Sequence, residues 1–437
     1  MPNHITRRSA VQTLLTGAGA LTAGSLFADE SPPAKQSADK LPTTGIANPD
    51  LAPFDDMMTG FLETHRVPGA ALAVTKDSRL VYARGFGLAD VDAKLPVQPD
   101  SLFRLASISK PLTSVSIMQL VEQSKFGLDD RVFEVLPAKD WLPEKYDERL
   151  RSVTIRHLLQ HTAGWDRQAS FDPISRVSDV SRVVNKPLPV GPAEVIRYTL
   201  TLPLDFEPGT RYAYYNVDYL LLGRIIELAS GQPYEAYVKK HVLAPVDVTR
   251  MQLGRAWKDD LAKGEVRYYD SKHRERAAVN GPELGVTVPL VYGGENFEAY
   301  EAHGGWIGSA IDLVRFASAL DNPQKSKLLK PESIQLMWSR PAGAPGHEED
   351  GKPKATYYAC GWNVRPVGDD GRASTWHGGL IAGTSTLFVR RHDGVNWAVL
   401  FNTDSNAAGK TLSSLIDPLV HQAANAVQRW PAAAVPA

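Results

Sequence analysis

The sequence has a single cysteine, Cys360, and no excess of either charge. One cysteine cannot close a disulfide within the chain or build a cysteine-rich metal site, and a buried, small apolar side chain is its commonest role. The 437 residues include 48 Lys and Arg against 49 Asp and Glu, which gives a net charge of -1 without visible charged blocks. We therefore expect neither a nucleic acid nor an anionic membrane as a partner.

Long hydrophobic runs are also missing, and the apolar stretch near the N-terminus is weak. Residues 10–28 are rich in Gly, Ala, Thr and Leu, and the pair Arg7-Arg8 precedes them. Such a segment is too polar to remain in a bilayer as an anchor. A charged start before a weak apolar run resembles a twin-arginine export signal. The sequence thus predicts an export signal over residues 1–28, a periplasmic or secreted protein, and no stable membrane insertion after cleavage.

Several common site motifs are absent as well. The chain has no G-x-S-x-G elbow, no phosphate-binding Walker loop and no dinucleotide fingerprint. His157 and His161 have the spacing of two metal ligands on one helix face, but the Glu that H-E-x-x-H needs as a general base does not follow His157. We expect both histidines to be core or capping residues, and the sequence predicts no metal and no cofactor.

The two ends of the chain differ in composition from the rest. Residues 29–50 are rich in Ser, Pro, Lys, Asp and Thr, which is typical of a flexible linker. Residues 431–437 are of low complexity and are predicted to be a disordered tail. Between them, residues 51–430 are expected to form the folded domain.

Apolar periodicity predicts the elements of this domain. Strands are expected over residues 69–74, 80–87, 357–364, 374–377, 384–390 and 397–402. Helices are expected over residues 55–64, 112–121, 129–136, 154–161, 192–202, 217–229, 233–242, 310–320, 330–339 and 409–427. Residues 165–190 and 258–300 look irregular. Strands at both ends with helices between them predict an α+β fold, in which about 51–120 and 300–430 build an antiparallel sheet flanked by helices and about 121–299 form an all-helical insertion.

Ser107 and Lys110 stand three residues apart where a helix is predicted to begin. This spacing places the hydroxyl and the amine on one helix face, within reach of each other. A serine hydroxyl needs a base to act as a nucleophile at neutral pH, and a partly desolvated lysine can be that base. The same spacing recurs at Ser37 and Lys40 in the predicted linker, so the pattern alone is a weak indication.

Tyr214 and Asn216 follow the predicted turn at Pro208-Gly209. A phenol close to a lysine ammonium is stabilised as phenolate, so Tyr214 could take the proton of Ser107 and later deliver it to a leaving group. Asn216 could orient a substrate carbonyl or amide and hold Lys110 in place. A simpler interpretation remains open, with Asn216 as a helix N-cap and Tyr214 as a core aromatic residue.

A glycine-rich triplet from His377 to Gly379 lies in a run that is predicted to be a strand, with Leu380 next. Glycines allow a substrate to approach an edge strand closely, and such a strand can offer an N–H group to a developing oxyanion. The same triplet begins at His303, ahead of a helix with a capping box. We favour His377 because strand patterns flank it, and a glycine-rich turn is the alternative for both triplets.

In this order, the S-x-x-K, Y-x-N and H-x-G elements resemble the serine β-lactamase and penicillin-binding-protein superfamily. The similarity is to the branch with class C β-lactamases, D,D-peptidases, D-aminopeptidases and family VIII carboxylesterases. Residues 103–107, 154–164 and 304–313 match that branch too, and the resemblance covers about residues 50–427.

The resemblance implies a role for each element of the site. Ser107 would be the acylated nucleophile, Lys110 its base partner and Tyr214 the second proton-transfer group; which of the last two is the principal base stays open. The backbone N–H groups of Ser107 and Leu380 would form the oxyanion hole. Substrate-binding residues would be Asn216, His377 and Gly379.

One departure from the family pattern bears on the substrate. Histidine stands at position 377, where β-lactamases typically have a lysine that pairs with the substrate carboxylate. A histidine is mostly neutral at pH 7 and anchors a carboxylate less well, which favours ester or peptide substrates over β-lactams.

The prediction is an exported serine hydrolase that forms an acyl-enzyme on Ser107 with small esters or peptide amides. Two alternatives are a β-lactamase or D-alanyl-D-alanine carboxypeptidase, and a non-catalytic binding or assembly protein on the same scaffold. The sequence leaves the oligomeric state and the physiological substrate open.

Overall fold

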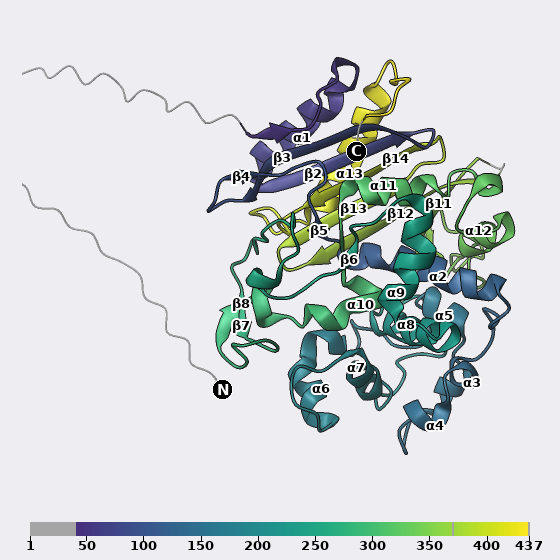
Figure 1. Cartoon of the computed structure of the whole chain (residues 1–437). Coiled ribbons are helices and arrows are strands. Elements are labelled where there is room, and N and C mark those ends of the chain that lie inside the picture. The colour runs from purple at the N-terminus through teal and green to yellow at the C-terminus, as the bar shows by residue number, and fades with distance from the viewer. Residues whose placement is uncertain (1–40, 369–370, 436–437) are drawn as a thin grey trace, which may run out of the picture. The chain divides into compact units, whose positions relative to one another are not determined.

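The computed structural model describes residues 41–368 and 371–435, whose elements are labelled in Figure 1. The predicted export signal and the first part of the predicted linker lie outside these residues. The longer helices are α1 (Ala52–His65), α2 (Ser109–Glu122), α7 (Pro192–Thr199), α8 (Val217–Ser230), α11 (Ala310–Ser318) and α13 (Leu412–Ala426). The shorter ones are α3 (Val132–Val135), α4 (Ala138–Trp141), α5 (Ile155–Leu159), α6 (Val177–Val183), α9 (Tyr234–Val238), α10 (Glu301–Gly304) and α12 (Pro331–Met337).

The main sheet is assembled from both ends of the domain, as predicted. Its strands are β1 (Thr43–Thr44), β2 (Gly69–Lys76), β3 (Arg79–Asp90), β4 (Leu95–Pro96), β10 (Tyr357–Tyr358), β11 (Asn363–Val367), β12 (Arg372–Ile381), β13 (Thr384–Arg390) and β14 (Val395–Phe401). Within the described residues their order is β1-β3-β2-β14-β13-β12-β11-β10, with β4 on β3, and every pairing is antiparallel. The α+β fold is confirmed.

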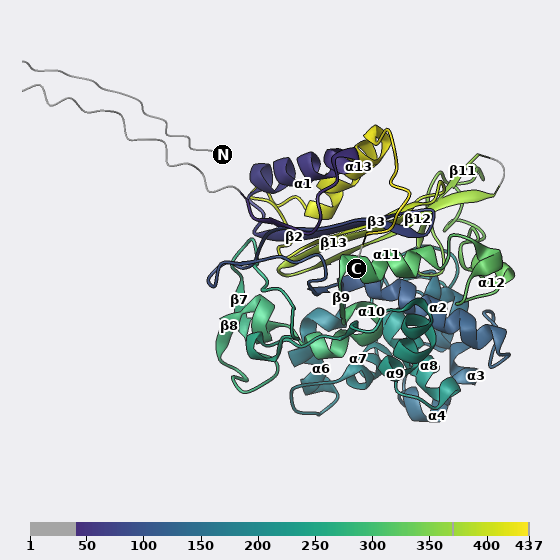
Figure 2. The ribbon, with the colours of Figure 1, turned by 45° about the horizontal axis from the view of Figure 1, so that its top comes forward.

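The central strand β2 shows why the two faces of the sheet are covered differently. Leu72 and Val74 point into a core that they share with α1 and α13, whereas Ala71 and Ala73 point to the face on which α11 packs. Side chains alternate between the faces of a strand, so the small alanines allow α11 to lie close to the sheet. Figure 2 shows α1 and α13 on one side of the sheet and α11 with the helical insertion on the other.

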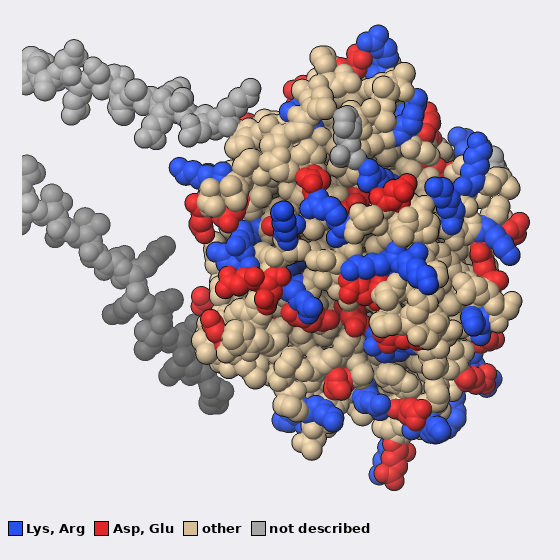
Figure 3. All heavy atoms as spheres, in the orientation of Figure 1, with Lys and Arg blue, Asp and Glu red and all other residues tan. Residues whose placement is uncertain are grey.

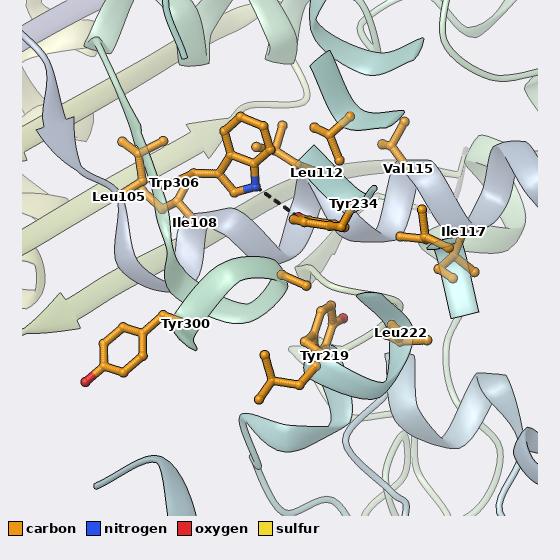
Figure 4. Close-up of a cluster of buried hydrophobic side chains, with 14 of the residues drawn as sticks. Leu105, Ile108, Leu112, Val115, Ile117, Tyr219, Leu222, Tyr234, Tyr300 and Trp306 are labelled. Atoms are coloured by element: carbon orange, nitrogen blue, oxygen red, sulfur yellow. Dashed lines mark hydrogen bonds between the residues drawn. The ribbon is translucent and has the colours of Figure 1, made fainter. Parts of the chain in front are cut away.

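Helix α2 follows the turn with Ser107 and is buried almost throughout. It lies between the sheet and the insertion, where α8 and α10 contact it. Figure 4 shows Leu112 of α2 near Trp306 and Tyr234, whose side chains share a hydrogen bond of 2.9 Å. A helix enclosed in this way cannot shift without disrupting the core, so the residues at its N-terminal end are held firmly in place.

Two small sheets extend the fold. One consists of β5 (Phe103–Arg104), β9 (Trp306–Gly308) and β6 (Gln252–Leu253), and it leads into the turn with Ser107. The other is the hairpin of β7 (Glu275–Ala277) and β8 (Thr287–Pro289), which lies within residues 258–300, the stretch expected to be irregular.

The structure differs from the predicted elements in several places. The insertion predicted to be all-helical over about 121–299 also contains the short strands β6, β7 and β8, so that part of the prediction is wrong. The strand predicted over residues 357–364 is two strands, because Gly361 turns the chain with a φ of +80°. The irregular stretch 165–190 contains α6. Both ends of the domain are more ordered than predicted, since β1 lies in the expected linker and the Val435 N–H, in the expected tail, donates to Leu80 O at 2.8 Å.

The surface shows no block of one charge on the face drawn in Figure 3, where Lys and Arg alternate with Asp and Glu. No helix among residues 41–368 and 371–435 has the length and apolar character that crossing a membrane would need.

Candidate active site

Ser107 lies in the 3-10 turn Ala106–Ile108, between β5 and α2. The residue before it, Ala106, has a φ of +49°, a left-handed conformation that is costly for a residue with a Cβ. Ser109 holds this conformation by donating its hydroxyl to Ala106 O at 2.7 Å, and Thr386 of β13 donates to Leu105 O at 3.0 Å. The turn that presents Ser107 is therefore fixed by hydrogen bonds from two elements.

Lys110 lies one helical turn along α2 with its side chain fully buried. Its Nζ is 3.2 Å from Ser107 Oγ, 2.9 Å from Asn216 Oδ1 and 2.9 Å from His303 O. Burial lowers the pKa of Lys110 well below its ordinary value, and the charge of Asp172 opposes this shift. The structure thus brings the amine and the hydroxyl together, as their spacing predicts.

Tyr214 approaches Ser107 from the other side. Its hydroxyl donates to Ser107 Oγ at 2.7 Å, and Lys110 Nζ lies 4.6 Å from the centre of its ring. Burial raises the pKa of Tyr214 well above 10, although the hydrogen bond with Ser107 lowers it in part. In this resting arrangement Tyr214 is therefore a phenol that donates its proton, rather than the phenolate considered from the sequence.

Asn216 occupies the N-cap position of α8, but its side chain makes no capping hydrogen bond. Instead its Oδ1 accepts from Lys110, and its Nδ2 donates to Asp172 Oδ2 at 2.7 Å. The simpler interpretation of Asn216 as a capping side chain is wrong, because the amide belongs to the hydrogen-bond network of Lys110.

His377 lies on β12 and is 3% exposed. Its Nδ1 bonds with Gly378 O at 2.7 Å, and its Nε2 lies 3.0 Å from the Tyr358 hydroxyl. Burial lowers the pKa of His377 to about 3, so the ring is neutral. In this conformation neither ring nitrogen is open to a substrate, although His377 lines the hollow beside Ser107.

The second triplet, at His303, also reaches the site, but through the main chain. His303 lies on α10 and its carbonyl oxygen accepts from Lys110 Nζ. Burial lowers the pKa of the His303 ring. The triplets that begin at His303 and His377 therefore both reach the site, one through Lys110 and the other beside Tyr214. The sequence around them did not indicate that both would do so.

Strand β12 passes against the turn that carries Ser107. A Cβ on Gly379 would lie 2.3 Å from Leu105 O, so only glycine permits this approach. Within the described residues β11 pairs with β12 only as far as Trp376, which leaves the following edge of β12 free of a partner strand. Such an edge can offer main-chain groups to a substrate, and Leu380, which lies on it, lines the hollows on both sides of Ser107.

Two hollows meet at Ser107, and Arg167 and Leu380 line both. The Asn216 hollow, of about 200 Å³, is lined in addition by Asn216, Asp172, Ile174, Tyr300 and His303. The His377 hollow, of about 400 Å³, is lined in addition by Tyr212, Tyr214, Tyr358, Asn363, His377, Thr411, Ser413 and Ser414. A substrate with its reacting carbonyl at Ser107 can extend into either hollow.

Sequence reasoning missed Asp172 and Arg167, both from the stretch that looked irregular. Arg167 is exposed, and its guanidinium lies 4.8 Å from the centre of the Tyr214 ring. Neither residue belongs to a recognisable motif, and only the folded chain places them beside Asn216 and Tyr214.

Behind Tyr214 lies a second group that sequence reasoning did not connect with the site. The His161 ring is 4.3 Å from the Tyr214 ring, and its Nδ1 lies 2.8 Å from Asp218 Oδ2. Burial lowers the pKa of His161 and raises that of Asp218, which opposes charge on either group. His157, by contrast, completes the capping box of α5 with Thr154, which confirms the expected capping role.

Comparisons with known proteins identify the family of the chain. The family model described as Beta-lactamase matches residues 54–418. Esterase EstB from Burkholderia gladioli is 29% identical over 372 residues, which cover 80% of this chain and 90% of that protein. Penicillin-binding protein 4* from Bacillus subtilis is 29% identical over 336 residues, covering 76% of this chain and 67% of that protein.

A solved structure supports the fold. EstCE1, described as a hydrolase with promiscuous acyltransferase activity, superimposes with a TM-score of 0.63 at 22% identity and covers 87% of this chain and 99% of its own. At that identity the likeness concerns the fold alone.

Proposed function

The chain belongs to the beta-lactamase family of serine hydrolases, and from that premise we propose that it is exported and cleaves small esters or amides through an acyl-enzyme on Ser107. The observation that carries the proposal is the position of Ser107 Oγ between Lys110 Nζ at 3.2 Å and Tyr214 Oη at 2.7 Å. Export rests on the paired Arg7-Arg8 ahead of the weak apolar run.

Acylation begins with transfer of the Ser107 proton to Lys110. Burial lowers the pKa of Lys110 and raises that of Tyr214, so lysine is the better base of the two. A neutral Lys110 can keep two N–H bonds, to Asn216 Oδ1 and His303 O, while its lone pair faces Ser107 Oγ. Ser107 Oγ then attacks the substrate carbonyl carbon, and the N–H groups of Ser107 and Leu380 stabilise the oxyanion.

Collapse of the tetrahedral intermediate breaks the bond to the leaving group. Tyr214, whose hydroxyl points at Ser107 Oγ, donates its proton to the departing oxygen or nitrogen. The Tyr214 oxygen then regains a proton from the Lys110 ammonium. Water enters where the leaving group was, and the same groups run the proton transfers in reverse to release the acid and free Ser107.

Replacing Ser107 with Ala tests the proposal. The nucleophile is lost, so kcat/KM for p-nitrophenyl butyrate should fall at least about a thousandfold, to the rate of the uncatalysed reaction. Ser37→Ala is the matched control because it removes the serine of the same S-x-x-K pattern elsewhere in the chain. Turnover by Ser107→Ala at the wild-type rate would refute the proposal. Failure of acylating probes to label Ser107 would favour a binding or assembly protein.

A second candidate substrate is an anionic one, such as a β-lactam or a peptide with a free C-terminal carboxylate, and Arg167 favours it. Arg167 borders the larger hollow, and among the residues lining that hollow none is a carboxylate. If an anion binds there, Arg167→Gln should lower kcat/KM for nitrocefin or a D-alanyl-D-alanine peptide about tenfold more than for p-nitrophenyl butyrate. Arg211→Gln, which removes an arginine paired with Asp166, is the control. Equal losses on anionic and neutral substrates would exclude this candidate.

A further inference from the structure

Asp172 is a carboxylate that is connected to Lys110 through the side-chain amide of Asn216. We propose that Asp172 is a positioning residue for the hydrolysis: its carboxylate holds the Asn216 amide with the oxygen facing Lys110, and its negative charge stabilises the Lys110 ammonium. The inference rests on the proposed function and adds to it a residue that favours the protonated form of Lys110, which arises when Lys110 takes the proton of Ser107.

The orientation of the Asn216 amide depends on both of its partners. Asn216 Nδ2 donates to Asp172 Oδ2 at 2.7 Å, and Asn216 Oδ1 accepts from Lys110 Nζ at 2.9 Å. A flipped amide would set an N–H donor against the lysine and an oxygen against the carboxylate, which loses both hydrogen bonds. A carboxylate can only accept, so Asp172 specifies the orientation that gives Lys110 an acceptor.

Asp172 is itself held in place by the start of the 3-10 turn Pro173–Arg176. Its Oδ1 accepts from the Ile174 N–H at 3.2 Å, and its main-chain oxygen accepts from the Ser175 hydroxyl at 2.8 Å. The two carboxylate oxygens thus have separate partners, one within the turn and one in the site. This arrangement fixes the distance between the turn and Asn216.

The charge of Asp172 acts on two groups that transfer protons. It raises the pKa of Lys110, against the larger effect of burial, and it also raises the pKa of Tyr214. The other charged or titratable groups around Lys110 are Asp218, Arg167, Tyr214, Tyr219, His161, His303 and His377. Burial lowers the pKa of all three histidines and raises that of Asp218 well above its ordinary value, so Asp172 and Arg167 are the groups whose charge matters most. Burial raises the pKa of the Asp172 carboxyl as well, and its hydrogen bonds with Asn216 and Ile174 oppose that rise.

Two substitutions separate the hydrogen bond from the charge. Asp172→Asn removes the charge and keeps one oxygen, which can accept from Asn216 if the bond from the Ile174 N–H is given up. Asp172→Ala removes the charge and both acceptors. Asp205→Asn is the control, because Asp205 fastens the same stretch of chain through the Asp166 N–H and the Ser170 hydroxyl and lines neither hollow. For each variant, kcat and KM for the neutral ester p-nitrophenyl butyrate are measured from pH 5 to 9.5, and thermal unfolding monitors the fold.

The proposal predicts different results for the two variants. Without the negative charge the pKa values of Lys110 and Tyr214 fall, so the pH profile of Asp172→Asn should move to lower pH while its optimal kcat stays within about threefold of wild type. Asp172→Ala should lose roughly ten- to hundredfold in kcat at its optimum, with a smaller change in KM, since the Asn216 amide is no longer fixed. The Asp205→Asn profile should coincide with that of wild type.

Three results would overturn the proposal. They are an Asp172→Asn profile that coincides with wild type, an Asp172→Ala variant with wild-type kcat, and an equal loss of kcat in both variants. If Asp172→Ala does not fold, the profile of Asp172→Asn decides alone. Failure of the proposed function is distinguishable, because it would appear as turnover by Ser107→Ala, whatever the Asp172 variants do.

Discussion

Burial keeps the histidines around Lys110 neutral, and this matters to the chemistry of the site as much as the groups that carry charge. Lys110 is enclosed, and the histidines nearest to it, at positions 161, 303 and 377, all have pKa values lowered by burial. Protonating any of these rings would set a second positive charge beside the lysine. Burial also raises the pKa of Asp218 well above its ordinary value, which leaves Asp172 as the nearby group that can balance the Lys110 ammonium.

His377 should make the stability of the protein depend on pH in a defined direction. Its pKa is about 3 in the folded protein against an ordinary 6.5, so the unfolded chain binds one more proton between these values. The stability that this difference contributes is present above pH 6.5 and is lost as the pH falls toward 3, at about 1.4 kcal/mol per pH unit.

The His377→Asn variant isolates this contribution. The free energy of unfolding is measured in urea between pH 7 and 4.5. It should fall less steeply with acidification in the variant than in wild type, and the two slopes should differ by about 1.4 kcal/mol per pH unit, the value for one proton. His347→Asn, in an exposed loop, is the control for changing a histidine. Parallel curves for wild type and His377→Asn would show that His377 is not held neutral by the fold.

At the scale of elements, the approach of β12 to the turn before Ser107 decides which main-chain groups a substrate can meet. Gly379 is the point of closest approach, since a Cβ there would lie 2.2 Å from Thr386 Oγ1 and 2.3 Å from Leu105 O. The threonine side chain can move, but the Leu105 carbonyl belongs to the fixed turn. The neighbouring Gly378 has only one atom within 4 Å of such a Cβ, Thr386 O at 3.7 Å.

These two glycines form a matched pair for mutation. Gly379→Ala should destabilise the protein by about 1–3 kcal/mol, because the strand must move away from the turn. Gly378→Ala should change the free energy of unfolding by less than about 1 kcal/mol. Thermal or urea unfolding of both variants provides the comparison, and equal stabilities would mean that β12 does not need to lie against the turn.

Elements with a local signal were predicted well, and those determined by distant contacts were not. The capping box of Ser309 and Asp312 was visible in the sequence and opens α11 as expected. Helix α6 was missed because only Val177 and Val180 of its residues are buried, too few for a periodic pattern. The turn at Gly361 was missed because the residue that a Cβ there would meet, Ser114 of α2, lies far away in the sequence.

At the scale of the whole molecule, the site exists because the two ends of the chain share one sheet. Strand β14 pairs with β2, with Ala398 opposite Ala73, and this pairing sets β12 and β13 beside the turn that β5 delivers. The arrangement of strands at both ends was predictable from apolar patterns. The pairing of β14 with β2 was not, because the buried strands offer many apolar registers and no local feature selects one.

In the candidate site, too, local sequence patterns predicted some contacts, and contacts between distant parts of the chain were not predictable from them. Ser107 and Lys110 share a helical turn, so their contact follows from spacing alone. The grouping of Tyr214, Asn216 and His377 with them came from family resemblance. Asp172 had neither signal, because its place beside Asn216 depends on how an irregular stretch of chain folds over α8.

The central claim, that Ser107 is the nucleophile, is tested most directly by covalent labelling. The wild-type protein is treated with a fluorophosphonate, and the loss of p-nitrophenyl butyrate hydrolysis is followed together with the label on each peptide by mass spectrometry. We expect one label per chain, on the peptide that contains Ser107, and a loss of activity in proportion to it. Full activity with Ser107 labelled, or loss of activity with the label elsewhere, would contradict it.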